Sequence, residues 1–203
     1  MTMKIVTPII LFTCILMSGC SKSDHNDNPS EDNNETYGNF TFTARGETVT
    51  CTDTENQGTY VHDLHGANHL TIFGINRDVP ENKENTVSIE LMLQGELKPG
   101  AYSFVDAGQW GNCIGNSSSA CNNISFGQVL PNGDINYDEA ASKKVLQSTG
   151  GTLNITSVTI GKYVNGFAEG KISGTFSYSG TNLWKLDGTA SGKFEDIPLL
   201  SAE

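Results

Sequence analysis

The sequence predicts an all-β fold, an antiparallel β-sandwich of about nine short strands. Apolar and polar side chains alternate along much of the chain after residue 38, and this alternation is the pattern of a half-buried strand. Turns rich in glycine and asparagine separate the candidate strands, and no strand–helix–strand rhythm occurs, which argues against an α/β fold. Helix signals are found over residues 138–146, where acidic residues come first and lysines late.

A hairpin is predicted at the start of the domain, around a two-residue turn at Arg45-Gly46. Its two strands alternate in phase, so the same face carries the apolar residues of both. The predicted cross-strand pairs are Phe40 with Cys51, Phe42 with Val49, and Ala44 with Glu47.

Further strand candidates fill the middle of the domain. They cover residues 59–63, 69–75, 86–93, 101–105, 125–130 and 152–160. In the last of these, Leu153 and Ile155 share one face, whereas Val158 and Ile160 are out of step by one residue. A single inserted residue has this effect, so a β-bulge is predicted between the two pairs.

Residues 168–178 and 184–194 alternate most regularly, and the loop Gly180-Thr181-Asn182 is predicted to join them into a second hairpin. The predicted register pairs Tyr178 with Trp184, Phe176 with Leu186, and Glu169 with Lys193. This register also sets glycine against glycine. Because opposed glycines let a second layer approach closely, a sandwich is preferred to a barrel.

The N-terminal residues have the features of a secretory signal. Lys4 precedes an apolar run over residues 5–17, which as a helix would be roughly 20 Å long and too short for a roughly 30 Å hydrocarbon core. Met17-Ser18-Gly19-Cys20 resembles the lipobox of bacterial lipoproteins. The resemblance implies a signal peptide over residues 1–19 and acyl chains, such as palmitate, on Cys20. The alternative is an ordinary secretory signal with Cys20 as a disulfide partner.

Residues 20–38 are expected to form the lipidated cysteine and a flexible linker, because the segment after Cys20 has almost no apolar side chains to offset its ordering entropy by burial. The root-mean-square reach of this linker is roughly 24 Å. Residues 39–203 are then long enough for one β-sandwich domain. The formal net charge of −11 repels phosphates, so no nucleic-acid partner is expected, and membrane contact would come from the acyl chains.

The cysteines of the domain are Cys51, Cys113 and Cys121. Cys113 and Cys121 bracket a polar loop, and an exported protein could close it with a disulfide. Such a bridge would contribute roughly 2.6 kcal/mol of stability. Cys51 has the phase of a buried strand residue, so an inert core thiol is preferred to a reactive one.

The C-terminal half contains the segments GTLNITSV, GKISGTFSYSG and LDGTASGKFEDIPL. This part of the chain resembles the small, uncharacterised single-domain lipoproteins of Bacteroides-type Gram-negative bacteria. The resemblance covers residues 151–199 well and residues 40–50 more loosely, whereas residues 106–123 depart from it. It implies a β-sandwich and anchoring at the cell surface or in the periplasm, and it carries no assigned activity.

Two groups of residues could suggest a metal. His62, His65 and His69 are close in sequence, but His62 and His65 point to opposite faces of an extended chain, so zinc is not expected. A second group, with Asn or Asp at every other position, starts like a calcium loop and consists of Asn132, Asp134, Asn136 and Asp138. An EF-hand is excluded because Tyr137 and Lys143 occupy its glycine and glutamate positions. An irregular surface calcium site stays open.

The candidate ligand-binding residue is Trp110, which lies in the glycine-rich segment 106–123. An indole face can stack on a sugar ring, and neighbouring Asp and Asn side chains can hydrogen-bond to its hydroxyls. The alternative is a structural role, in which the Trp110 side chain packs into the end of a sandwich. No nucleophile elbow, phosphate loop or dinucleotide fingerprint occurs, so no catalytic residue and no cofactor is assigned.

These observations predict a lipid-anchored protein of the outer membrane, on either its periplasmic or its cell-surface side. Its domain is expected to be a non-catalytic binding module for a glycan or another macromolecule. The alternative is a structural or assembly component of an outer-membrane complex, which would bind an envelope protein.

Overall fold

The computed structural model describes residues 38–51, 56–64, 67–79, 83–106, 122–129 and 139–200. The chain divides into two units, Met1–Asn34 and Glu35–Glu203, and every described residue belongs to the second. Its strands are β1 (Asn39–Ala44), β2 (Glu47–Cys51), β3 (Gln57–Leu64), β4 (Ala67–Val79), β5 (Lys83–Leu93), β6 (Gly100–Phe104), β7 (Asn123–Val129), β8 (Leu146–Val164), β9 (Phe167–Thr181) and β10 (Gly188–Leu199). One short helix, α1 (Glu139–Lys144), precedes β8 in this described part.

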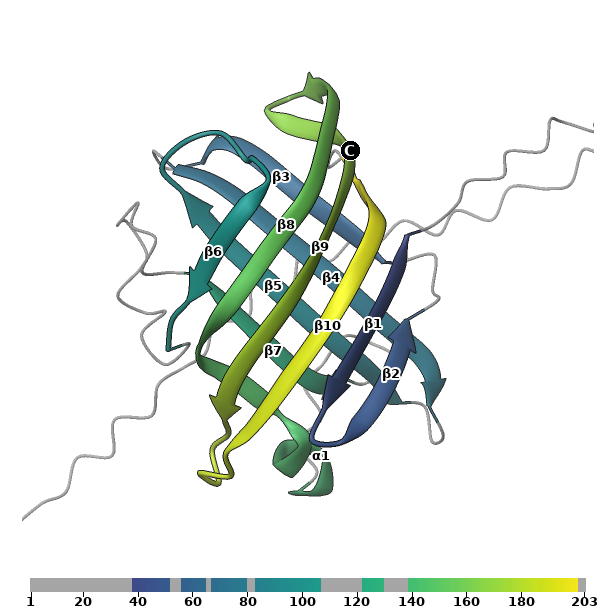
Figure 1. Ribbon diagram of the computed structural model, residues 1–203. Helices are drawn as coiled ribbons and strands as arrows, with labels where there is room; N and C mark the ends of the chain where they lie inside the picture. The colour runs from purple at the N-terminus through teal and green to yellow at the C-terminus, as the bar shows by residue number, and fades with distance from the viewer. Residues whose placement is uncertain are drawn as a thin grey trace, which may run out of the picture. The chain divides into compact units, whose positions relative to one another are not determined.

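The ten strands form one sheet in the order β2-β1-β10-β9-β3-β4-β5-β7-β8-β6. Additional pairings of β8 with β9 and of β10 with β3 close seven of these strands into a barrel (Figure 1). The hairpin of β1 and β2 continues the sheet from β10, and β6 pairs with β8. The predicted all-β class is confirmed, whereas the predicted two-layered sandwich is not what the strand pairing shows.

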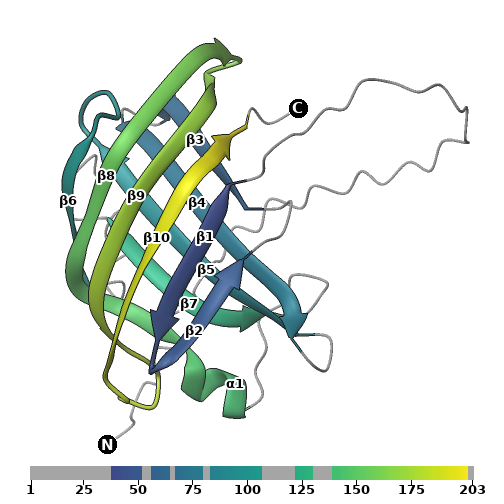
Figure 2. The same ribbon diagram turned by 45° about the vertical axis from the view of Figure 1, so that its right-hand side comes forward.

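Strand β8 explains how the sheet closes. Its first residues pair with β7, its middle pairs with β6, and almost its whole length pairs with β9. The register between β8 and β9 shifts at three places, and each bulge adds twist and bend to the strand. A long strand that bends repeatedly carries the sheet around on itself, as a barrel requires. Figure 2 shows the curved course of β8 and β9.

Aromatic rings form part of the barrel's interior, together with buried aliphatic side chains. Phe40 stacks on Phe194 with 5.8 Å between ring centroids and lies 5.9 Å from the ring of Phe176. The ring centroids of Phe42 and Phe126 are 5.1 Å apart. These five phenylalanines are all buried, so the barrel has a packed core like that of other globular domains.

The first predicted hairpin is confirmed, including its register. Phe40 pairs with Cys51, Phe42 with Val49, and Ala44 with Glu47. Arg45 and Gly46 have positive φ angles of 51° and 83°, as a type I′ turn requires at both central positions. The turn type therefore accepts arginine here despite the strain of a left-handed conformation.

The second predicted hairpin is present, but its register is wrong. Strands β9 and β10 pair Tyr178 with Ala190 and Phe176 with Gly192, not Tyr178 with Trp184 and Phe176 with Leu186. The loop is therefore longer than expected and contains Trp184 and Leu186. Phenylalanine faces glycine in the observed register: an added Cβ on Gly192 would lie 2.6 Å from Cζ of Phe176. A bulky ring needs the empty space above a glycine, and this requirement outweighs the predicted pairing of aromatic with aromatic.

The other predicted elements are confirmed with shifted ends. Each of the strand candidates in the middle of the domain overlaps one observed strand, from β3 to β8. The predicted bulge in β8 is found between Ile155 and Ser157. The predicted helix is present as α1 but is shorter, with Glu139 in its first turn and Lys143 and Lys144 in its last.

Tyr178 makes the free energy of unfolding depend on pH in the alkaline range. Its hydroxyl is buried and donates a hydrogen bond to the carbonyl of Leu146 at 3.1 Å, and burial raises the pKa of Tyr178 well above its usual value. Above pH 10 the unfolded chain therefore loses a proton that the folded chain keeps. We expect the free energy of unfolding to fall by about 1.4 kcal/mol per pH unit from this residue.

Denaturant unfolding between pH 8 and pH 11 measures this effect. In Tyr178→Phe, the free energy of unfolding should fall less steeply with pH, by about 1.4 kcal/mol per pH unit. The variant also lacks the hydrogen bond to Leu146, so its stability at neutral pH is lower. An unchanged pH slope in the variant would contradict the assignment.

Candidate functional site

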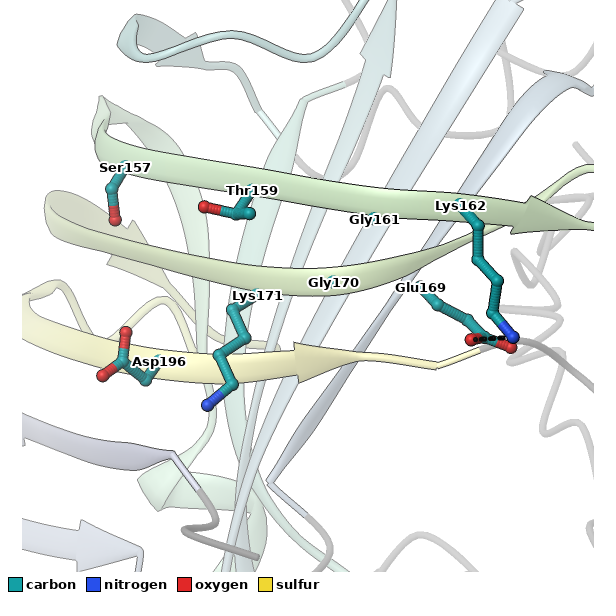
Figure 3. Close-up of a pocket in the computed structure, with 8 residues that line it drawn as sticks. All are labelled: Ser157, Thr159, Gly161, Lys162, Glu169, Gly170, Lys171 and Asp196. Carbon is teal, nitrogen blue, oxygen red and sulfur yellow. Dashed lines mark ion pairs between the residues drawn. The ribbon is translucent and has the colours of Figure 1, made fainter.

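The outer face of β8, β9 and β10 carries a groove of about 600 Å³ (Figure 3). Two of the three strands, β8 and β10, carry a bulge there. The register shifts between Ile160 and Lys162 on β8 and between Phe194 and Ile197 on β10. Because bulges bend and twist a sheet, they hollow a face that would otherwise be evenly convex. The groove is lined by Ser157, Thr159, Gly161, Lys162, Glu169, Gly170, Lys171 and Asp196.

Two glycines leave the backbone bare along the groove. Gly161 on β8 and Gly170 on β9 lie beside each other in Figure 3. A Cβ on Gly170 would collide with the carbonyl oxygen of Thr159, whereas a Cβ on Gly161 would meet nothing closer than the Glu169 carbonyl oxygen at 3.6 Å. Glycine at 170 is therefore required by the fold, while glycine at 161 keeps an otherwise available space open.

Charged side chains stand on both sides of these glycines. Lys162 forms an ion pair with Glu169 at 3.0 Å, and Lys171 and Asp196 lie on the opposite side (Figure 3). Asp196 has a positive φ of 53°, and its backbone N–H donates to Oγ of Ser173 at 2.9 Å. This hydrogen bond holds the bulge that presents the Asp196 carboxylate.

The groove is suited to a polar ligand. Its lining offers hydroxyls, ammonium groups, carboxylates and bare backbone, and none of the lining residues is aromatic. Within the described ranges, no cluster of His, Cys, Asp and Glu is arranged to hold a metal ion. The arrangement can therefore donate and accept several hydrogen bonds along an open surface.

A second feature is a cluster of exposed apolar side chains in the loop between β9 and β10. We call Leu183, Trp184 and Leu186 the apolar tip. Their exposed fractions are 83%, 52% and 42%. Sequence reasoning missed this feature because it placed Trp184 and Leu186 inside a strand. The signals for a loop were Gly180 and Gly188 at its two ends and Asn182 near its start.

Asn182 fixes the backbone of the apolar tip. Its buried side-chain oxygen accepts hydrogen bonds from the N–H groups of Trp184 at 2.9 Å and Leu186 at 3.1 Å. Its amide nitrogen donates to the Lys143 carbonyl at the end of α1. From the other side, Nη2 of Arg45 donates to the Leu186 carbonyl at 2.6 Å. The loop is thus tied to both α1 and the β1–β2 turn.

Several predicted site residues lie outside the described residues. These are Cys20, His65, Trp110, Cys113, Cys121, Asn132, Asp134, Asn136 and Asp138. Cys51 is buried in the core, as predicted. Val61 on β3 pairs with His69 on β4, so His62 and His69 point to opposite faces of the sheet. The ring of His62 meets Tyr163 at 5.9 Å, and burial lowers the pKa of His69.

Comparison with known proteins adds no relative. No protein-family model matches the chain, and no match is found among curated proteins or solved structures. In the part of the chain with described coordinates, no helix has the length and apolar character needed to cross a membrane.

Proposed function

We propose that this chain is a lipid-anchored protein of the outer membrane whose barrel is a non-catalytic binding module for a glycan. The anchor is proposed from Met17-Ser18-Gly19-Cys20 and the polar segment that follows. Acyl chains on Cys20 would hold the protein at the membrane, since two or three chains give durable binding where one is marginal. Residues 20–38 would then act as the tether of the barrel.

The open groove on β8, β9 and β10 is the observation that carries the glycan proposal. Side chains from three neighbouring strands line it, and most of them can hydrogen-bond to sugar hydroxyls. The bare backbone at Gly161 and Gly170 lets a ring approach the sheet closely. A groove that is open to solvent also suits a polymer chain, which must pass through a site rather than be enclosed by it.

Filling the groove tests this proposal. Gly161→Val adds a side chain where the fold leaves room, and valine is favoured in strands. We expect Gly161→Val to retain the stability of the parent chain and to weaken glycan binding about tenfold or more, since a blocked site loses its hydrogen bonds. A glycan array followed by titration of any polysaccharide that binds measures this change.

Ser177→Val is the matched control, because Ser177 is exposed on β9 and does not line the groove. Ser177→Val should bind like the parent chain. Equal binding by Gly161→Val and Ser177→Val would contradict the groove as the site. Trp110→Ala belongs in the same titration, and a loss confined to that variant would transfer the site to the segment around Trp110.

The second candidate function is a structural or assembly role in an envelope complex. The ends of the strand order, β2 and β6, favour it, because an edge strand can pair with a strand of another protein. If the parent chain binds none of many polysaccharides on a glycan array, this result would support the structural role. A charged substitution on β6, such as Ala101→Lys, should then release an envelope partner that Gly161→Val retains.

A further inference from the structure

The apolar tip is a built feature of the loop between β9 and β10. Its three large apolar side chains are between 42% and 83% exposed to water. Asn182 and Arg45 fix their backbone instead, and Lys185 between them has a positive φ of 56°. A residue held in this left-handed conformation is strained. The hydrogen bonds and the strained residue hold the loop in a conformation that exposes apolar side chains. We infer that these side chains bind a partner.

The shape and composition of the tip favour a lipid surface over a sugar or a small molecule. Small-molecule sites are concave, whereas the tip is a loop whose side chains project outwards. Leu183 is the most exposed of the three and offers a sugar no hydrogen bond. Tryptophan, leucine and lysine together are typical of segments that enter the headgroup region of a bilayer.

The charges around the tip differ from those of the chain as a whole. In α1, the β1–β2 turn and the β9–β10 loop, the described cations are Arg45, Lys143, Lys144 and Lys185, and the described acids are Glu47, Glu139 and Asp187. Lys143 pairs with Glu139 at 2.6 Å and Lys144 with Glu47 at 3.8 Å. The described charges of this end therefore nearly cancel, although the formal net charge of the chain is −11. Nζ of Lys143 lies 5.4 Å from the centroid of the Trp184 ring. An end of the barrel without excess negative charge can approach anionic lipid headgroups, which repel an acidic surface.

The position of the tip allows it to reach a membrane that already holds the acyl chains. Strand β1 starts at Asn39 and ends beside the tip, at the turn whose Arg45 binds the loop (Figure 2). Six residues of β1 span roughly 20 Å. The polar tether has a root-mean-square reach of roughly 24 Å. The reach of the tether exceeds the span of β1, so the tether is long enough for the tip to meet the membrane that would hold Cys20.

We propose that the apolar tip enters the headgroup region of the bilayer to which Cys20 is anchored and forms a second membrane contact. This inference rests on the proposed lipid anchor. The groove residues are near the β8–β9 turn, at the end of the barrel away from the tip (Figure 1). The second contact therefore orients the barrel with its groove away from the lipid, where a glycan can enter.

Tryptophan fluorescence of the acylated full chain in vesicles tests the proposal. Trp110→Phe leaves Trp184 as the single tryptophan, since the sequence has two. The vesicles contain phosphatidylethanolamine and phosphatidylglycerol, with or without a lipid brominated on its acyl chains. We expect co-flotation with the vesicles, loss of Trp184 emission with brominated lipid, and protection of Trp184 from aqueous iodide.

Leu183→Ser and Leu200→Ser form a matched pair in the same background. Leu200 follows β10 at the other end of that strand and is 44% exposed. Leu183→Ser should reduce the inserted fraction about tenfold, the change expected for one leucine leaving an apolar environment. Leu200→Ser should leave quenching by brominated lipid unchanged. Equal quenching in the two variants would overturn the proposal.

The remaining outcomes separate the tip from the anchor. Co-flotation with full access of iodide to Trp184, and no effect of brominated lipid, would overturn the tip and leave the anchor standing. Protection of Trp184 that requires an added polysaccharide or envelope protein would assign the tip to that partner instead. A chain that does not float with vesicles would remove the anchor and, with it, the second contact.

Discussion

Replacing Phe40 by alanine is expected to lower the free energy of unfolding by about 3–5 kcal/mol. The ring of Phe40 is fully buried and contacts the rings of Phe42, Phe176 and Phe194. It also fills the space above Gly74, where an added Cβ would lie 2.6 Å from Cγ of Phe40. Alanine leaves one space among the close-packed rings and another above Gly74. The strands of the sheet cannot shift to fill both spaces.

Denaturant unfolding of Phe40→Ala measures this loss. Leu183→Ala is the control, because it also removes a large apolar side chain but from a position that is 83% exposed. Its stability should stay within about 0.5 kcal/mol of the parent chain. A loss below about 1 kcal/mol in Phe40→Ala would be inconsistent with a tightly packed interior.

Replacing Gly192 by alanine is expected to cost about 3 kcal/mol through overpacking. An added Cβ would lie 2.5 Å from the carbonyl oxygen of Thr41 and 2.6 Å from Cζ of Phe176. The backbone oxygen belongs to the paired strand β1 and cannot move without breaking the sheet. The ring of Phe176 is held by its contacts with Phe40 and Tyr178. Neither the Thr41 carbonyl nor the Phe176 ring can therefore move without a cost in free energy.

Gly127→Ala in β7 supplies the comparison for Gly192→Ala in unfolding experiments. An added Cβ at Gly127 would meet only Cγ2 of Val145, at an ordinary 3.7 Å. Gly127→Ala should be neutral or should stabilise the chain by up to about 1 kcal/mol, because alanine restricts the unfolded chain. Equal effects of the two substitutions would show that the contact of Phe176 with Gly192 does not constrain the core.

Local patterns in the sequence were enough to predict the first hairpin. Its turn is short, its strands alternate in phase, and both kinds of information agree on one register for Phe40 and Cys51. The bulge after Ile155 was predicted for the same reason, since a break in alternation is visible within a few residues. Such features depend on neighbours in sequence, and tertiary contacts do not override them.

The register of the last hairpin depended on contacts that alternation does not contain. Alternation continues through Trp184 and Leu186, although these residues belong to a loop held by Asn182. Phe176 and Phe194 needed to face glycines across the strands, and that need decided the register. Closure into a barrel had a similar origin, because it depends on where β10 meets β3, far away in sequence.

The candidate site was harder to predict than the fold. The groove forms where bulges in β8 and β10 fall on the same outer face, and no sequence pattern states that two bulges will be neighbours. Its charged residues are common on exposed strands. The histidines suggested a metal site because three of the four in the sequence lie close together, yet His62 and His69 point to opposite faces of the sheet.

Mass spectrometry of the chain isolated from membranes tests the lipid-anchored module most directly. The result that we predict is a mature N-terminus at Cys20, with a diacylglycerol on its sulfur and a further acyl chain on its amine. Substitution of Cys20 by serine should abolish that mass and release the protein from washed membranes. A chain that retains Met1 and carries no acyl group would contradict both the anchor and the orientation proposed for the barrel.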